Sequence, residues 1–322
     1  MTKGKILITG TLLLCLVFNS MGQGCSDAGF CTMGAMKPDQ TYNKKVKLKL
    51  RSIEVSYYRG ETTLTPVVYV ANLDATVGIG ENMAFQFKLP YQWVTGNFDN
   101  TAGMGDISLS LTRKFIDGEK FDISGTVGGK IPSNKADLES SGEKHPLSEG
   151  ACLPMYYQVS LGSYDLVAGA SAISSKWLFA TGIQMALTAN NNTFSWNDWL
   201  PPVYPSESYV KKYALATKLK RGTDIMFRVE RNFRFTRYSF NVGLLSICRI
   251  THDQIIDKTT NEYYKVDGTT GWAITALAGF NYNFNINNGV KLSYGYKLTD
   301  REVNPDGLTR HQVMTLGYLF RF

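Results

Sequence analysis

The sequence predicts an all-β protein, an antiparallel transmembrane β-barrel of twelve strands, on three observations. The N-terminus has the composition of an export signal. Beyond it there is no apolar run of about 18 residues, the length that a transmembrane helix needs. Short segments instead alternate between apolar and polar residues, in a chain with 17 Phe, 18 Tyr and 30 Gly. Alternation and aromatic enrichment are typical of strands that cross a membrane.

The first 22 residues have the features of a signal peptide. Lys3 and Lys5 form a basic start, residues 6–18 are mostly apolar, and Gly22 is a small residue at the cleavage position. We therefore expect residues 1–22 to be removed on export.

Residues 23–44 form a short N-terminal segment with no clean periodicity. It contains Cys25 and Cys31, which export would bring into an oxidising compartment, so we expect a disulfide between them. Metal or haem ligation is the alternative, but no second ligand pair supports it. We expect this periplasmic segment to plug the barrel or to dock a partner protein, and a disulfide-pinned tail is the simpler alternative.

Residues 45–322 contain the expected barrel. Within 45–58 the alternation changes phase at Ser52-Ile53, which predicts a β-bulge. The expected strands are 45–58, 64–78, 83–94, 105–115, 120–131, 158–173, 176–189, one ending near 233, 236–249, 271–284, 288–298 and 309–322.

The lengths of the connections support this strand count. If the last residue is periplasmic, the short connections near 79–82, 116–118, 174–175, 234–235 and 285–287 all fall inside. The longer ones at 93–103, 132–154, 190–206, 250–270 and 299–308 all fall outside, as bacterial barrels require. Residues 207–222 are ambiguous, because an extra hairpin there would give fourteen strands.

The last strand has a strong aromatic face, with Tyr318, Phe320 and Phe322 at alternate positions. This ending resembles the C-terminal signal that the barrel assembly machinery recognises in bacterial outer-membrane proteins. The resemblance implies a location in the outer membrane, in contact with its lipid.

If the aromatic faces meet lipid, the opposite polar faces line the lumen. The candidate lumen residues are Asp74, Lys88, Asp106, Lys114, Asp122, Lys130, Arg228, Glu230, Arg237, Lys291 and Lys297. Mixed charges in a narrow barrel form either a hydrogen-bonded, ion-paired filling or a conduit with a basic bias for small acidic solutes.

One outer loop is rich in aromatic residues. We expect Phe194, Trp196, Trp199 and Tyr204 to form an outer gate or ligand contact. A small cap folded over the barrel mouth is the alternative.

Two further cysteines are assigned to the outer end of the barrel. Cys152 closes an outer loop and Cys248 lies near the end of a strand. They form either a second disulfide on the outer rim or two free thiols.

The motif Gly103-Met104-Gly105-Asp106, followed by Ile107 and Leu109, resembles a family signature. It is similar to the Gly-x-Gly-Asp-aliphatic-x-Leu motif of the outer-membrane transporter-like proteins named for the meta-pathway of phenol degradation. Residues 161–169 resemble a second family segment, at the start of its sixth strand. The resemblance implies a barrel related to fatty-acid-type transporters that moves small hydrophobic compounds. The cysteine-containing N-terminal segment departs from the family pattern, and the style of the chain resembles Bacteroidota.

The sequence does not favour catalysis or a cofactor. The three histidines are His145, His252 and His311, and no serine stands beside a recognisable orienting Asn or Asp. No metal-ligand cluster or phosphate-binding glycine loop is evident. The net charge of +7 is compatible with nucleic acid, but an exported chain rarely meets any. The expectation is a transporter-like channel, with two alternatives: an accessory subunit of an outer-membrane complex with an occluded lumen, or a narrow porin.

Overall fold

A computed structural model describes residues 32–37 and 49–322, except 63, 65, 135, 200–205, 258 and 309. The predicted signal peptide 1–22 and the predicted Cys25–Cys31 disulfide lie outside the described residues.

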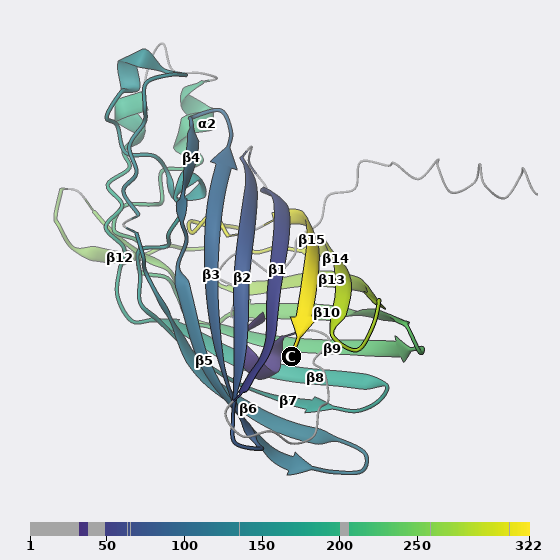
Figure 1. Ribbon diagram of the computed structural model, residues 1–322. Coiled ribbons are helices and arrows are strands. Elements are labelled where there is room, and N and C mark those ends of the chain that lie inside the picture. Colours follow the sequence, from purple (N-terminus) through teal and green to yellow (C-terminus); the bar gives the residue numbers. More distant parts are fainter. Residues whose placement is uncertain are drawn as a thin grey trace, which may run out of the picture.

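In the described chain, twelve antiparallel strands form a closed barrel. The ring closes because β1 (Lys49–Thr62) pairs with both β2 (Val67–Ile79) and the last strand, β15 (Arg310–Arg321), as Figure 1 shows. The other barrel strands are β3 (Met83–Thr95), β5 (Ile107–Asp117), β6 (Asp122–Ile131), β7 (Asp165–Ile173), β8 (Trp177–Ala186), β9 (Asp224–Arg234), β10 (Tyr238–Arg249), β13 (Gly271–Asn283) and β14 (Asn288–Thr299). The predicted fold class and strand number are confirmed.

Alternation places apolar side chains outside and polar ones inside, as predicted. On β15, Met314, Leu316 and Tyr318 are each about half exposed, whereas Val313 and Leu319 are buried. The predicted bulge is also present, because the β1–β2 register shifts between Leu50 and Ser52.

The two ends of the barrel differ in the length of their connections, which confirms the expected orientation pattern. Turns at 80–82, 118–121, 174–176, 235–237 and 284–287 lie at one end, together with the C-terminus. The long connections 132–164, 187–223, 250–270 and 300–309 lie at the other, which we call the outer end.

The outer connections carry short elements of their own. They are the 3-10 helices η3 (Pro146–Ser148), η4 (Met155–Tyr157) and η5 (Trp196–Trp199), the helix α2 (Glu207–Lys211) and the hairpin β11 (Gln254–Ile256) with β12 (Tyr263–Lys265). Residues 207–222 therefore contain a helix and not a hairpin of the barrel, which excludes fourteen strands. Among the described residues, no helix has the length and hydropathy to cross a membrane.

Two expectations for the strands were wrong. Most of the extra strand β4 (Asn100–Met104) lies in the predicted connection 93–103; it pairs with the outer part of β3 and is followed by β5. The predicted strand 158–173 begins only at Asp165, because its first residues form a buried loop. Val159 and Leu161 alternate as in a strand, but both are buried inside the barrel mouth.

Candidate functional site in the barrel lumen

A short piece of the N-terminal segment lies inside the barrel. We call residues 32–37 the inserted segment; it contains the 3-10 helix η2 (Gly34–Met36), which contacts β3, β5, β6, β7 and β8. Ala35 and Met36 are completely buried. The backbone N–H of Gly34 donates to Gln86 Oε1 at 2.7 Å, and that of Ala35 donates to Thr126 Oγ1 at 2.7 Å. Barrel side chains therefore accept hydrogen bonds from two buried backbone N–H groups of this segment, as burial requires.

Apolar packing holds the same segment against the barrel wall. Met33 and Met36 form one cluster with inward side chains of β7, β8, β9 and β10, namely Val167, Leu178, Ala180, Met226 and Leu245. These apolar residues interrupt the polar inner face at the place where the two methionines pack, which explains their inward orientation.

Lys37 ends the inserted segment in a cluster of charges. Its Nζ lies 3.0 Å from Glu54 Oε2 and 3.1 Å from Asp74 Oδ2. Glu54 also pairs with Lys291 at 3.3 Å, and Asp74 Oδ2 accepts a 2.7 Å hydrogen bond from Gln86. Lys37 therefore connects β1 and β2 through two carboxylates.

Lys88 differs from the other lysines of the cavity in the partner of its ammonium group. It lies directly across from Asp74 in the β2–β3 pairing. Its Nζ nevertheless donates to Thr32 Oγ1 at 3.2 Å. Within the described chain, no carboxylate comes within 4.0 Å of Lys88 Nζ. Asp74 Oδ1, the other oxygen of the same carboxylate, is buried without a hydrogen-bond partner among the described residues.

A cavity of about 190 Å³ lies between the inserted segment and the outer loops. Its charged lining includes Lys37, Glu54, Asp74, Lys88, Asp106, Lys130 and Lys291. Its apolar lining comes from both the wall and the loops and includes Val70, Pro90, Met155, Val159, Leu161, Leu277 and Leu308. The cavity can hold a small molecule that presents both polar and apolar surface.

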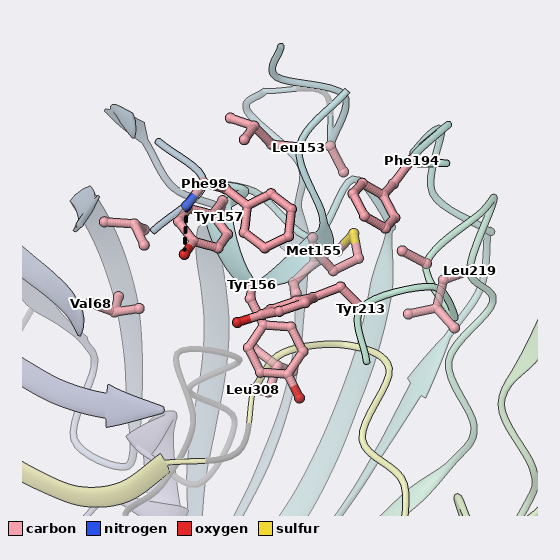
Figure 2. Close-up of a cluster of buried hydrophobic side chains, with 14 of the residues drawn as sticks. Val68, Phe98, Leu153, Met155, Tyr156, Tyr157, Phe194, Tyr213, Leu219 and Leu308 are labelled. Carbon is pink, nitrogen blue, oxygen red and sulfur yellow. Dashed lines mark hydrogen bonds between the residues drawn. The ribbon is translucent and has the colours of Figure 1, made fainter. Parts of the chain in front are cut away.

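The outer loops form a cap over this cavity. In its core Phe98 packs edge-on against Tyr157, Trp199 and Tyr213, with ring centroids 5.4, 4.7 and 4.9 Å apart. Figure 2 shows Phe98 together with Tyr157 and Tyr213. The same cluster includes Leu153, Tyr156, Phe194, Leu219, Ile255 and Leu308. We call this cluster, with the loops that carry it, the outer cap. Its size indicates a folded structure and not a set of open loops.

The aromatic gate candidates belong to the outer cap. Phe194 and Trp199 are buried in its core, and Trp199 Nε1 donates to the carbonyl of Cys152 at 3.2 Å. Trp196 packs on its edge, with Lys211 Nζ 4.2 Å from the ring centre. Tyr204 lies outside the described residues. Phe194, Trp196 and Trp199 thus lie where a small cap folded over the barrel mouth would place them.

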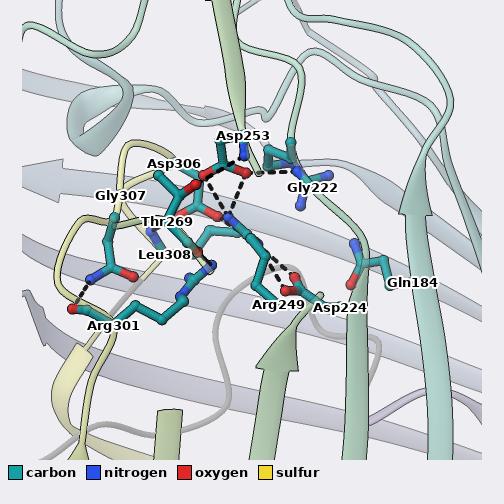
Figure 3. Close-up of polar contacts among 12 residues, drawn as sticks. Gln184, Gly222, Asp224, Arg249, Asp253, Thr269, Arg301, Asp306, Gly307 and Leu308 are labelled. Carbon is teal, nitrogen blue, oxygen red and sulfur yellow. Dashed lines mark hydrogen bonds and ion pairs between the residues drawn. The ribbon is translucent and has the colours of Figure 1, made fainter. Parts of the chain in front are cut away.

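Arg249, at the outer end of β10, fastens the outer cap to the barrel. Figure 3 shows its guanidinium between three carboxylates, with Asp224 and Asp253 at 2.8 Å and Asp306 at 2.9 Å. Burial alone would raise the pKa of Asp306, but Arg249 and the more distant Arg301 hold it well below its usual range. Two separate outer connections, around 253 and around 306, are thereby joined to one strand end.

The Gly-x-Gly-Asp motif fastens another part of the cap. Asp106 accepts hydrogen bonds from Ser160 Oγ at 2.5 Å and from the backbone N–H of Leu161 at 3.1 Å, and Lys130 lies 3.7 Å away. A Cβ at Gly105 would come within 3.2 Å of the carbonyl oxygen of Val159, so the glycine permits this close approach. The motif therefore holds the buried loop against the wall.

The remaining candidate lumen residues lie at several levels of the barrel. Arg228 pairs with Glu230, and both are buried. Lys297 pairs with Asp300 at 2.6 Å near the outer end. Lys114 and Asp122 lie 3.7 Å apart near the turn end. Arg237 is the exception, because it is exposed in the turn between β9 and β10 and does not face the lumen.

Cys152 and Cys248 are free thiols, so the alternative of a second disulfide was wrong. Cys152 is buried in the outer cap, where burial raises the pKa of its thiol. Cys248 precedes the inward Arg249 and therefore points to the outer face of the wall. Cys152 thus lies in the core of the cap, whereas Cys248 lies on a barrel strand.

The three histidines lie in separate parts of the described chain. His145 Nε2 lies 2.9 Å from the carbonyl oxygen of Asn97, and its ring packs edge-on against Trp199. His252 is in an outer connection and His311 in β15. Among the described residues, no group of three or more His, Cys, Asp or Glu has the arrangement of a metal site.

Sequence reasoning missed the residues that organise the lumen. Lys37 lies in a segment without periodicity, and Arg249 belongs to a strand but was not assigned a partner. Only alternation offered a signal, because Arg249 has the same parity as the inward Asn241 and Leu245.

No family model and no curated protein matches this sequence. Among solved structures, the chain is similar to an outer membrane channel from Pseudomonas putida F1, with a TM-score of 0.57 and 13% identity over 88% of this chain and 99% of that chain. It also matches NanC porin (TM-score 0.46, 8% identity, 85% and 100% covered) and KdgM porin (0.41, 9%, 84% and 99%). The first similarity, together with the apolar outward face, shows the fold of an outer-membrane β-barrel.

Proposed function

We propose that this chain is a transporter-like barrel of the bacterial outer membrane that passes small hydrophobic compounds. The observation that carries the proposal is the cavity enclosed between the inserted segment and the outer cap. Its volume of about 190 Å³ is that of a compartment for a small guest. For comparison, an engineered apolar cavity of about 150 Å³ binds benzene. A guest of about one ring therefore fits.

The wall beside the cavity suits the exchange of such a guest. In the described chain β4 pairs only with β3, and β6 ends at Ile131, opposite Ile107. Loop side chains cover the free edge of β4, with Asn134 Nδ2 donating to the carbonyl of Met104 at 2.7 Å. Side-chain contacts are easier to open than a strand ladder, so this edge supports a route for an apolar molecule.

The family resemblance supports the same function. We propose that the chain is related to the transporter-like barrels named for the meta-pathway of phenol degradation, in a Bacteroidota-like branch, and has no enzymatic activity. We further propose a signal peptide at 1–22, a plug at 23–44 and the barrel at 45–322, inserted by the assembly machinery through Tyr318, Phe320 and Phe322. We assign the pore function to the inward charged residues around the cavity.

Binding of a one-ring probe tests this proposal. The purified barrel in detergent is titrated with fluorobenzene and followed by 19F NMR, with protein-free micelles as the reference. Val159→Trp would fill the cavity, whereas Val242→Trp adds the same side chain on the outer face, where Val242 is 50% exposed. We expect binding in the unchanged protein and in Val242→Trp only. Equal signals in both variants would remove the cavity as the binding site.

The second candidate is an accessory subunit of an outer-membrane complex. It is favoured by the filling of the lumen from both ends, by the inserted segment and by the outer cap. A stable partner that co-purifies through residues 23–44, in a protein that binds no probe, would select it. A narrow porin for small acidic solutes requires instead an open, ion-conducting lumen.

A further inference from the structure

The charge balance around the cavity depends on the inserted segment. The cavity lining contains three wall lysines, Lys88, Lys130 and Lys291, and the three carboxylates of Glu54, Asp74 and Asp106, and these six groups balance. The lining also contains Arg228, which pairs with Glu230, Asp306, which pairs with Arg249, and Arg310, which donates to the carbonyl of Gly307. Lys37 enters with the inserted segment and adds a fourth ammonium group without a fourth carboxylate, so this set of lysines and carboxylates has one excess positive charge.

The excess charge resides on Lys88. Lys130 lies beside Asp106, Lys291 beside Glu54, and Lys37 between Glu54 and Asp74. Lys88 faces Asp74 across the strand pair, yet its described hydrogen bond is to the hydroxyl of Thr32. Lys37 and Gln86 share Asp74 Oδ2, while the Oδ1 atom of the same carboxylate has no hydrogen-bond partner in the described chain. In the described chain Asp74 is therefore paired with Lys37 and not with Lys88.

An ammonium group in a cavity with low exposure to solvent requires a compensating anion. The same cavity carries apolar surface from Pro90, Val159 and Leu161, on the loop side of the lumen. The chemistry that matches both features is a small organic monoanion with an apolar body.

We propose that the cavity binds a one-ring carboxylate whose anionic group pairs with Lys88, and that Lys37 creates this site by taking Asp74 away from Lys88. The proposal rests on the proposed function and specifies its substrate class as amphipathic anions. Withdrawal of the inserted segment returns Lys88 to Asp74 and releases the anion. Binding of the ligand and residence of the segment are therefore coupled.

The test compares an anion with a neutral molecule of the same shape. The full mature protein in non-ionic detergent is titrated with 4-fluorobenzoate and with 4-fluorobenzyl alcohol at neutral pH, by 19F NMR. We expect the carboxylate to bind more tightly after correction for micelle partition. Lys88→Met should weaken carboxylate binding about tenfold or more, which corresponds to about 1.4 kcal/mol, and should leave the alcohol unchanged.

A double variant tests whether Lys37 acts indirectly, by pairing with Asp74, or by contacting the ligand itself. Lys37→Met should also lose carboxylate binding, because Lys88 then pairs with Asp74. Adding Asp74→Asn removes that competing carboxylate, so the double variant should regain most of the lost affinity. Lys114→Met, near the turn end and outside the cavity lining, is the matched control and should bind as the unchanged protein does. Heat-modifiable migration on SDS gels checks that each barrel is folded.

The outcomes distinguish the two proposals. Equal binding of carboxylate and alcohol, or carboxylate binding unaffected by Lys88→Met, overturns the anion site and leaves the hydrophobic compartment standing. Failure of Asp74→Asn to rescue Lys37→Met overturns the exchange of partners at Asp74. If neither probe binds the unchanged protein, the proposed function fails together with the anion site.

Discussion

Replacing Arg249 by Met should open the outer cap, because it leaves Asp224, Asp253 and Asp306 without their shared cation. Arg249 is 2% exposed and pairs with all three at 2.8–2.9 Å. Removing one partner from a buried ion pair costs about 3–5 kcal/mol, because a charge is left uncompensated. At about 1.4 kcal/mol per factor of ten, the lower figure corresponds to an opening constant about a hundredfold larger.

Cys152 supplies a native reporter of this opening. Its side chain is buried in the core of the outer cap, so a maleimide reaches the thiol only when the cap opens. The assay uses a protein in which Cys25, Cys31 and Cys248 are serine, and measures the labelling rate by mass spectrometry. We expect Arg249→Met to raise that rate at least about a hundredfold, because the substitution leaves buried charge uncompensated in the closed cap.

The matched control is Arg59→Met, which breaks an exposed pair. The Arg59 and Glu61 side chains are 43% and 35% exposed. Such surface pairs contribute about 0–1 kcal/mol, so labelling should change by less than about fivefold. Equal labelling rates in the Arg249→Met and unchanged proteins would refute the idea that this cluster holds the cap closed.

Three further predictions concern the inserted segment, the pH dependence of the cap and assembly. Gly34 has φ +48° and its Cβ position lies 2.4 Å from Thr112 Oγ1, so Gly34→Val should expel the inserted segment and expose it to trypsin; retained protection would contradict its placement. The folded pKa of Asp306 is depressed, so its stabilisation is present above the unfolded value of about 3.9 and is lost as pH falls below it. Hydrogen exchange of residues 152–161, corrected for intrinsic rates, should therefore accelerate below about pH 4. The Asp306→Asn variant should already exchange faster at neutral pH and should lose most of this acid dependence. An unchanged acid response in that variant would contradict the assignment of the acid dependence to Asp306. Deleting Phe322 should reduce the heat-modifiable barrel in outer-membrane fractions, and full assembly without it would show that the C-terminal aromatic is not read as a signal.

The barrel itself was predictable because the alternation that defines each strand is a local pattern in the sequence. Tyr318, Phe320 and Phe322 alternate with smaller residues, and the same period of two assigns lipid and lumen faces along each strand. The β-bulge at Arg51 was predictable in the same way, because the alternation of apolar and polar residues changes phase next to it. Alternation on β10 also places Cys248 on the face opposite Arg249, so the pattern already argues against a disulfide on the rim.

The interior was not predictable because its contacts join distant parts of the chain. Arg249 meets carboxylates that come from β9 and from two separate connections, and no local pattern relates them. Lys37 lies in a segment without periodicity, so its competition for Asp74 appears only when the segment is seen inside the barrel. The buried loop at Val159 alternates as a strand does, and only tertiary packing distinguishes the two.

The central claim is that the inserted segment and the outer cap together close the lumen to ions around a small compartment. Single-channel recording in a planar bilayer tests it most directly, with the full mature protein and with a form that lacks residues 23–44. We predict a silent full-length barrel and conductance only after the deletion. Steady, ion-selective conductance of the full-length protein would contradict the claim.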